Sequence, residues 1–60
     1  MTCADTAAIA LMLGMSVNAV RILAHRHPEI LPRRGRDHRG RTLYAIEDAE
    51  NILNARLATA

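Results

Sequence analysis

Arginine side chains are concentrated in the middle of this 60-residue chain. Seven of its eight arginines lie between Arg21 and Arg41, where Glu29 and Asp37 are the only acidic residues. This stretch therefore has a net charge of +5, whereas the whole chain has only +2. A basic strip of this density attracts a phosphate backbone. The charge distribution thus favours a DNA-binding module.

Metal chemistry is the first alternative, because His25, His27, His38 and Cys3 are all capable ligands. His25 and His27 are two residues apart, so they point to different faces of a helix. The chain has neither a second cysteine nor the ligand spacing of a zinc finger. We expect surface histidines, and we expect neither a metal nor another cofactor.

Catalysis is the second alternative. The acids Glu47, Asp48 and Glu50 fall at the start of a predicted helix, where carboxylates suit the helix dipole, so they are expected at the surface. The sequence contains no nucleophile–base arrangement and no phosphate-binding loop. It therefore predicts a binding protein and not an enzyme.

Length and composition predict one domain over residues 1–60, able to bury about 60 % of its unfolded surface. Cys3 has no partner for an internal disulfide, which fits a reducing cytosol. The longest apolar stretch, residues 7–13, is too short to cross a membrane, and no basic segment precedes it. We expect a cytoplasmic protein with no membrane partner.

Capping signals predict two helices in the first half of the chain. Asp5 is a good N-cap for a helix that runs to about Leu13, where Gly14 ends it. Ser16 caps a second helix over residues 17–26 or 17–27, and the following proline stops that helix.

The second half of the chain predicts a hairpin and a third helix. Asp37 and Gly40 occupy the first and fourth places of a type I turn, which joins strands over residues 33–36 and 41–44. Apolar residues then recur at helical spacing, and these are Ile46, Ala49, Leu53 and Leu57. The predicted fold is mostly α with a small β-hairpin, in the order helix, helix, hairpin, helix.

Ala10, Gly14 and Val20 have the spacing of a helix-turn-helix. The first is small so that the helices can cross, the glycine makes the turn, and the valine fills the angle between the helices. Further interior positions are Ile9, Leu13, Met15 and Leu23. The same spacing suits an ordinary helical hairpin in a small bundle. The arginine cluster favours the DNA-binding unit, because a packing hairpin does not need it.

With these elements in place, the chain resembles the winged helix-turn-helix domain of MerR-type regulators and of phage and plasmid excisionases. The resemblance covers about residues 4–57 and is specific in its order and spacing. Its matching residues are Asp5, Ala10, Leu13-Gly14-Met15-Ser16, Val20-Arg21, Pro32, Gly40-Arg41-Thr42-Leu43-Tyr44 and Asp48.

The resemblance implies a recognition helix over residues 17–26 in the major groove and a wing over residues 33–44 on the backbone or minor groove. Val17, Asn18 and Arg21 are then expected at base edges, where they suit a thymine methyl, adenine and guanine respectively. The residues expected at the DNA backbone are Ser16, Arg26, Arg33, Arg34, Arg36, Arg39, Arg41, Thr42 and Tyr44. Tyr44 would offer its hydroxyl to a phosphate while its neighbour Leu43 packs inward.

Three positions depart from the family pattern. Thr42 stands where MerR-type wings usually have arginine, so the backbone contact is weaker or moves to Arg41. Ala19 replaces a frequent threonine and removes a polar group from the recognition helix. Ile52 stands where excisionase-like members often have tryptophan, which makes that packing corner smaller.

The function predicted from the sequence is sequence-specific binding of double-stranded DNA, in recombination by an excisionase-like protein or in transcription regulation. The setting would be a bacterial cell or a phage-infected bacterium. One small domain binds weakly, so cooperative self-association on repeated sites is expected. The alternative is a small interaction protein that acts through an integrase, a polymerase or a phage factor, suggested by the apolar surface around Leu11 and Met12.

Overall fold

Side-chain caps fix where the first two helices begin. In the computed structural model, which describes residues 2–59, α1 spans Thr6–Leu13 and α2 spans Val17–Arg26. The Asp5 carboxylate accepts a hydrogen bond at 2.9 Å from the backbone N–H three residues later. Ser16 Oγ accepts the equivalent bond at 3.1 Å. Both N-caps predicted from the sequence are confirmed.

A left-handed glycine separates the two helices. Gly14 has φ 65° and ψ 34°, a conformation that side chains with a Cβ resist. The next N–H, from Met15, donates to Ala10 C=O at 3.0 Å and so completes the end of α1. The chain then bends by 97° between α1 and α2. Ala10 and Val20 are both buried at this crossing, as their spacing predicts.

Three strands form an antiparallel sheet in the order β1–β3–β2. β1 is Cys3–Asp5, β2 is Arg33–Arg36 and β3 is Thr42–Ala45. The predicted hairpin is therefore present, with its second strand shifted by one residue. The predicted element order omitted β1, because three residues are too few for a periodic pattern and the strand depends on pairing with distant β3. The domain is thus a small α/β unit of three helices and a three-stranded sheet.

The facing of β3 differs from the prediction. Tyr44 is only 2 % exposed and belongs to the core, while Leu43 is partly buried. The prediction placed Leu43 inward and Tyr44 outward. Successive residues of a strand point to opposite faces, so a facing that is wrong by one residue reverses both positions. A bulge in β2 between Arg33 and Gly35 shifts the pairing with β3, and hairpin periodicity alone does not reveal it.

The core lies where α1, α2, α3 and β3 meet. It includes Leu31, a residue of the loop between α2 and β2 that has no exposed surface. The complete buried cluster is Ile9, Ala10, Leu13, Val20, Ala24, Leu31, Tyr44 and Ala49.

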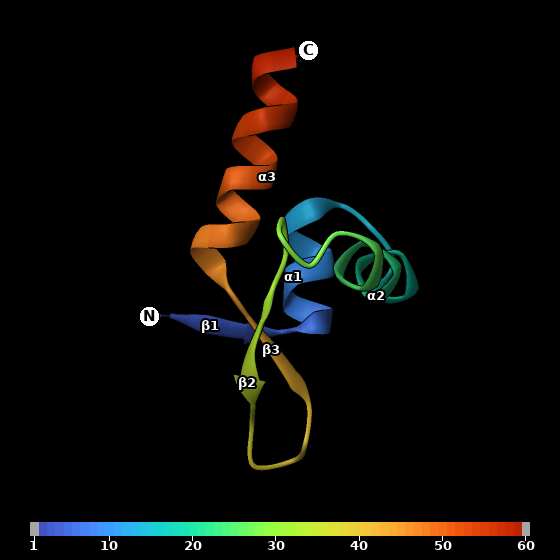
Figure 1. Ribbon diagram of the computed structural model, residues 1–60, viewed down its shortest axis with the longest axis vertical. Helices are drawn as coiled ribbons and strands as arrows, with labels where there is room; N and C mark the ends of the chain where they lie inside the picture. Colours follow the sequence, from blue (N-terminus) through green and yellow to red (C-terminus); the bar gives the residue numbers. More distant parts are fainter. Residues whose placement is uncertain (1, 60) are drawn as a thin grey trace.

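The third helix, α3, spans Ile46–Thr59 and carries the apolar stripe only in part. Ala49 is buried and Leu53 packs against the core, but Leu57 is 75 % exposed. The last turns of α3 extend beyond the other elements, so nothing covers Leu57 there (Figure 1). The tip of the β2–β3 hairpin lies at the opposite end of the molecule (Figure 1).

The helices of residues 2–59 are short compared with the thickness of a bilayer. The longest, α3, has 14 residues, whereas a helix needs about 20 apolar residues to cross the hydrocarbon core. No single helix in this range has the required length and apolarity. Only α1 and α2 taken together, across their 97° bend, have sufficient length and a suitable composition.

Replacing Gly14 tests the turn between α1 and α2. Gly14→Ala should lower the free energy of unfolding by about 1–2 kcal/mol, the cost of a left-handed residue that has a Cβ. Steric contact adds nothing, because no atom lies within 4 Å of the place that a Cβ would take. Gly14→Asn should cost less, since asparagine enters this region more readily. Urea unfolding measures both, and an alanine variant as stable as the native protein would contradict the assigned conformation.

Candidate functional site

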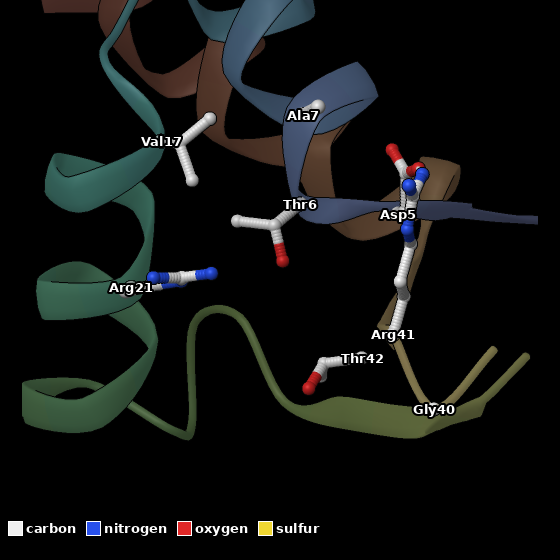
Figure 2. A pocket seen from close by; sticks show the side chains of 8 residues that line it. All are labelled: Asp5, Thr6, Ala7, Val17, Arg21, Gly40, Arg41 and Thr42. Carbon is white, nitrogen blue, oxygen red and sulfur yellow. The ribbon is translucent and has the colours of Figure 1, made fainter.

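A cleft of about 410 Å³ lies between the start of α1, the first turns of α2 and the β2–β3 hairpin. Figure 2 shows the two walls, with α2 on one side and the strands on the other. The residues that line it are Asp5, Thr6, Ala7, Val17, Arg21, Gly40, Arg41 and Thr42. Four of these, from α2 and the hairpin, are among the site residues predicted from the sequence.

The α2 wall presents the first turns of that helix. Val17 is 37 % exposed, and Asn18 and Arg21 are also exposed. Val17 and Arg21 line the cleft, whereas Asn18 lies outside it. Ser16 is exposed at the helix start, where its hydroxyl oxygen serves as the cap. All the predicted residues at the start of α2 are therefore accessible to a partner.

The hairpin wall is shaped by one carboxylate. Asp37 Oδ1 accepts hydrogen bonds from the backbone N–H groups of Arg39 at 2.8 Å and Arg41 at 2.9 Å. Gly40 N–H also donates to the Asp37 carbonyl at 3.0 Å, which confirms the predicted turn. The bonds from Arg41 and Arg39 hold the pKa of the Asp37 carboxyl below its usual value, since they stabilise the charged form.

Two of the clustered arginines have carboxylate partners within the fold. Arg34 donates through Nε and Nη2 to the two oxygens of Asp48 at 3.1 and 3.2 Å, which ties β2 to α3. This pair raises the pKa of the Arg34 guanidinium, so it stays charged. Arg41 Nη1 lies 3.3 Å from Asp5 Oδ2 and joins the hairpin to the start of α1. These contacts give the two arginines a structural role besides the phosphate binding predicted for them.

The other hairpin arginines are open to solvent. Arg33, Arg36 and Arg39 are exposed, and no ion pair involves them within residues 2–59. Arg36 is paired with Thr42 across the strands, and residues paired in this way point to the same sheet face. Arg36 is therefore on the face that borders the cleft. Arg26 is exposed at the far end of α2.

Tyr44 differs from the other predicted backbone contacts in its burial. It is only 2 % exposed, and its side chain belongs to the core with Ile9 and Val20. Tyr44 anchors β3 beneath the helices.

Sequence reasoning missed Thr6 and the Arg34–Asp48 pair. Thr6 follows the Asp5 cap, and only the folded arrangement brings it opposite the hairpin. Arg34 and Asp48 are 14 residues apart and meet because β3 turns directly into α3. Opposite charges in the sequence were the only available signal, and they did not identify the partners.

The histidines are placed apart from this cleft. His27 Nδ1 lies 3.3 Å from Glu29 Oε1 in the loop after α2. The pKa of the Glu29 carboxyl is lowered, first by a hydrogen bond from the backbone of Glu29 and then by His27. No group of three or more His, Cys, Asp or Glu side chains suited to a metal ion occurs in the described part of the chain.

Comparisons of this chain with protein-family models, with curated proteins and with solved structures give no significant match. Its chemistry is therefore inferred from the cleft itself. Guanidinium and hydroxyl groups line or border the cleft, and the hairpin adds unpaired positive charge. Such a surface suits a ligand that is rich in anionic oxygens.

Acid should loosen the hairpin turn. Because the folded pKa of Asp37 is depressed, its contribution to stability is complete above the unfolded value of about 3.9 and is lost as the pH falls through the lower folded value. The Arg39 and Arg41 amide resonances should therefore titrate with a midpoint below about 3.9, as followed by NMR. The same resonances in Asp37→Ala should lack this transition. A midpoint at or above the ordinary aspartate value would contradict the turn geometry.

Proposed function

We propose that this protein binds double-stranded DNA in a sequence-specific manner, as a winged helix-turn-helix. In this proposal α2 is the recognition helix in the major groove, and the β2–β3 hairpin is the wing. The observation that carries it is the cleft, where the exposed start of α2 and the arginine-bearing hairpin face one another. A groove-reading helix beside a basic hairpin suits a duplex, whose bases and phosphates lie side by side.

Charge supplies the non-specific part of the proposed binding. Within residues 2–59, five exposed arginines have no carboxylate partner, and these are Arg21, Arg26, Arg33, Arg36 and Arg39. The acids Asp5 and Asp48 each engage one further arginine, which keeps those carboxylates from repelling phosphates as free charges. Five phosphate contacts correspond to a slope of about −4 to −5 in log K against log salt concentration.

Base recognition is assigned to the first turns of α2. Asn18 can form two hydrogen bonds with adenine, and Val17 can contact a thymine methyl group. Both side chains are exposed, so neither must leave the core to reach a base. Ser16, Thr42 and Arg41 lie around them and are proposed backbone contacts.

The biological role that we propose is that of an excisionase-like protein or a small transcription regulator of a mobile element. A single domain of this size buries little surface on DNA, so one copy would bind weakly. Several copies on neighbouring repeated half-sites would bind cooperatively and could bend the duplex. Footprinting on a natural target should accordingly show adjacent protected sites that fill together.

The protein-partner alternative receives less support from the fold. Of the two residues that suggested it, Met12 packs against the core and only Leu11 is open, with 85 % exposure. At the place that suggested a protein partner, one exposed leucine is not a contiguous apolar patch. Other apolar side chains, Ile22, Ile30 and Leu57, are exposed elsewhere on the domain. DNA binding is the better explanation of the surface, because five unpaired arginines have no comparable structural purpose.

Removing the hairpin arginines should weaken binding to all sequences alike. In Arg33→Ala/Arg36→Ala/Arg39→Ala, the salt slope should become shallower by about 2.7, because each lost contact contributes about 0.9. Fluorescence anisotropy with a random-sequence duplex at several salt concentrations measures this change. The matched comparison uses single variants. Arg34→Ala should change the slope less than Arg33→Ala, Arg36→Ala or Arg39→Ala alone, because Arg34 is held by Asp48. No binding by the intact protein at low salt would refute the proposed function.

Replacing Asn18 should instead change which sequences are preferred. Asn18→Ala should cost about 1–3 kcal/mol at one base position and leave affinity for random duplexes nearly unchanged. Selection from a randomised duplex pool, performed with both proteins, shows the affected position. Asn54→Ala is the control, because Asn54 is exposed on α3 and away from the cleft. An identical preference in the Asn18 variant and the intact protein would rule out this residue as a base reader.

A further inference from the structure

We propose that the cleft holds one phosphodiester group of a DNA strand that passes between α2 and the hairpin. Arg21 is its ionic ligand, and Thr6 and Thr42 donate hydroxyl hydrogen bonds to it. This inference rests on the proposed DNA binding and deepens it. It gives Arg21 a phosphate as its partner, in place of the guanine expected from the sequence.

The direction of the side chains carries the proposal. Figure 2 shows the Arg21 side chain crossing from α2 towards Thr6, with its guanidinium inside the space between the walls. The Thr6 hydroxyl is directed into the same space from the start of α1, and Thr42 lies on its opposite side, on β3. Arg21 and Thr6 therefore point into one space, and Thr42 lines the same cleft from the hairpin, with a hydroxyl that can rotate.

The chemistry of these donors selects an anion with several oxygens. A guanidinium donates in a planar fork that matches phosphate geometry, and a hydroxyl donates along the direction to which it rotates. Arg21 has no carboxylate partner within residues 2–59, so its charge is available to a ligand. A cleft of about 410 Å³ is too small for a duplex and has room for one phosphodiester group of a strand.

The one acid in the cleft is neutralised by its own contacts. Asp5 uses Oδ1 to cap α1 and Oδ2 to bind Arg41 at 3.3 Å. Its charge is thus compensated, and the repulsion of an entering phosphate is reduced. The Asp5–Arg41 contact ties the end of β1, which leads into α1, to the start of β3, both on the strand side of the cleft. We assign these two residues a positioning role, which keeps the donors at a fixed separation.

A phosphate held in this way would fix the register of the protein on DNA without reading sequence. Base recognition would then fall to Val17 and Asn18, which lie one turn before Arg21 on the exposed part of α2. In the same selection experiment, replacing Asn18 should therefore change the preferred bases, whereas replacing Arg21 should leave them unchanged.

The first experiment compares Arg21→Gln with the intact protein in selection from a randomised duplex pool. The variant should keep the same base preferences, bind every duplex roughly tenfold more weakly, and have a salt slope shallower by about 0.9. Thr6→Val and Thr42→Val should each weaken all duplexes several-fold and leave the slope unchanged, because a hydroxyl releases no counterion. Thr2→Val is the control, since Thr2 is exposed and lies outside the cleft.

The second experiment identifies the phosphate itself. Neutral methylphosphonate linkages are introduced one at a time into the selected duplex, and affinity is measured for each. The intact protein should lose roughly tenfold at the linkage that enters the cleft, and Arg21→Gln should be insensitive at that same linkage. Thr6→Ser keeps the hydroxyl and should lose affinity at that linkage as the intact protein does, whereas Thr6→Val lacks the hydroxyl. This comparison separates the loss of a donor from a local folding defect.

The outcomes distinguish this inference from the proposed function. A changed preference at one base position in Arg21→Gln, without coupling to any linkage, would make Arg21 a base reader and overturn the phosphate site while DNA binding stands. Native affinity in both threonine variants would also overturn it. If the intact protein binds no duplex at low salt, the phosphate site fails together with the proposed function.

Discussion

The central strand β3 is the constraint on which the other elements depend. It pairs with β1 on one side and β2 on the other, and its chain continues directly into α3. Its Tyr44 is buried with residues of α1 and α2, so the same strand attaches the sheet to the helices. A chain of this length can form only a small core, and Tyr44 is the aromatic side chain in it. The hairpin therefore has a fixed position relative to α2, and the cleft between them is a product of the core.

The carboxylates divide the arginines into two groups. Asp48 holds Arg34 against α3, and Asp5 holds Arg41 against the start of α1, so these contacts keep the hairpin at a defined angle. The remaining hairpin arginines project from a support that is already positioned. A flexible basic loop would lose conformational freedom when it bound a phosphate backbone, and these two contacts reduce that loss. Internal ion pairs and unpaired cations thus serve the same proposed interface in different ways.

Local signals explain what the sequence could predict. The Asp5 and Ser16 caps, the left-handed Gly14 and the turn from Asp37 each depend on residues within a few positions, and all were predicted correctly. The features that were missed depend on residues far apart in the chain. These are the β1–β3 pairing, the inward facing of Tyr44, the Arg34–Asp48 pair, Arg56 Nη1 donating to Leu13 C=O at 2.9 Å, and the place of Thr6 in the cleft. For the site, sequence alone named most of the accessible residues but not which of them face one another.

Asp5 shows why residue type alone could not assign the roles within the site. It ends β1, caps α1 and binds Arg41, so a residue predicted only as a helix cap also ties the start of α1 to the hairpin. A carboxylate at the edge of a phosphate-binding surface is unfavourable unless its charge is compensated, and both of its oxygens are engaged here. The proposed interface therefore tolerates this acid because the acid is part of the fold. By the same reasoning, the arginines best suited to a phosphate are those that the fold leaves without an internal partner, which places Arg21 and the exposed hairpin arginines before Arg34 and Arg41.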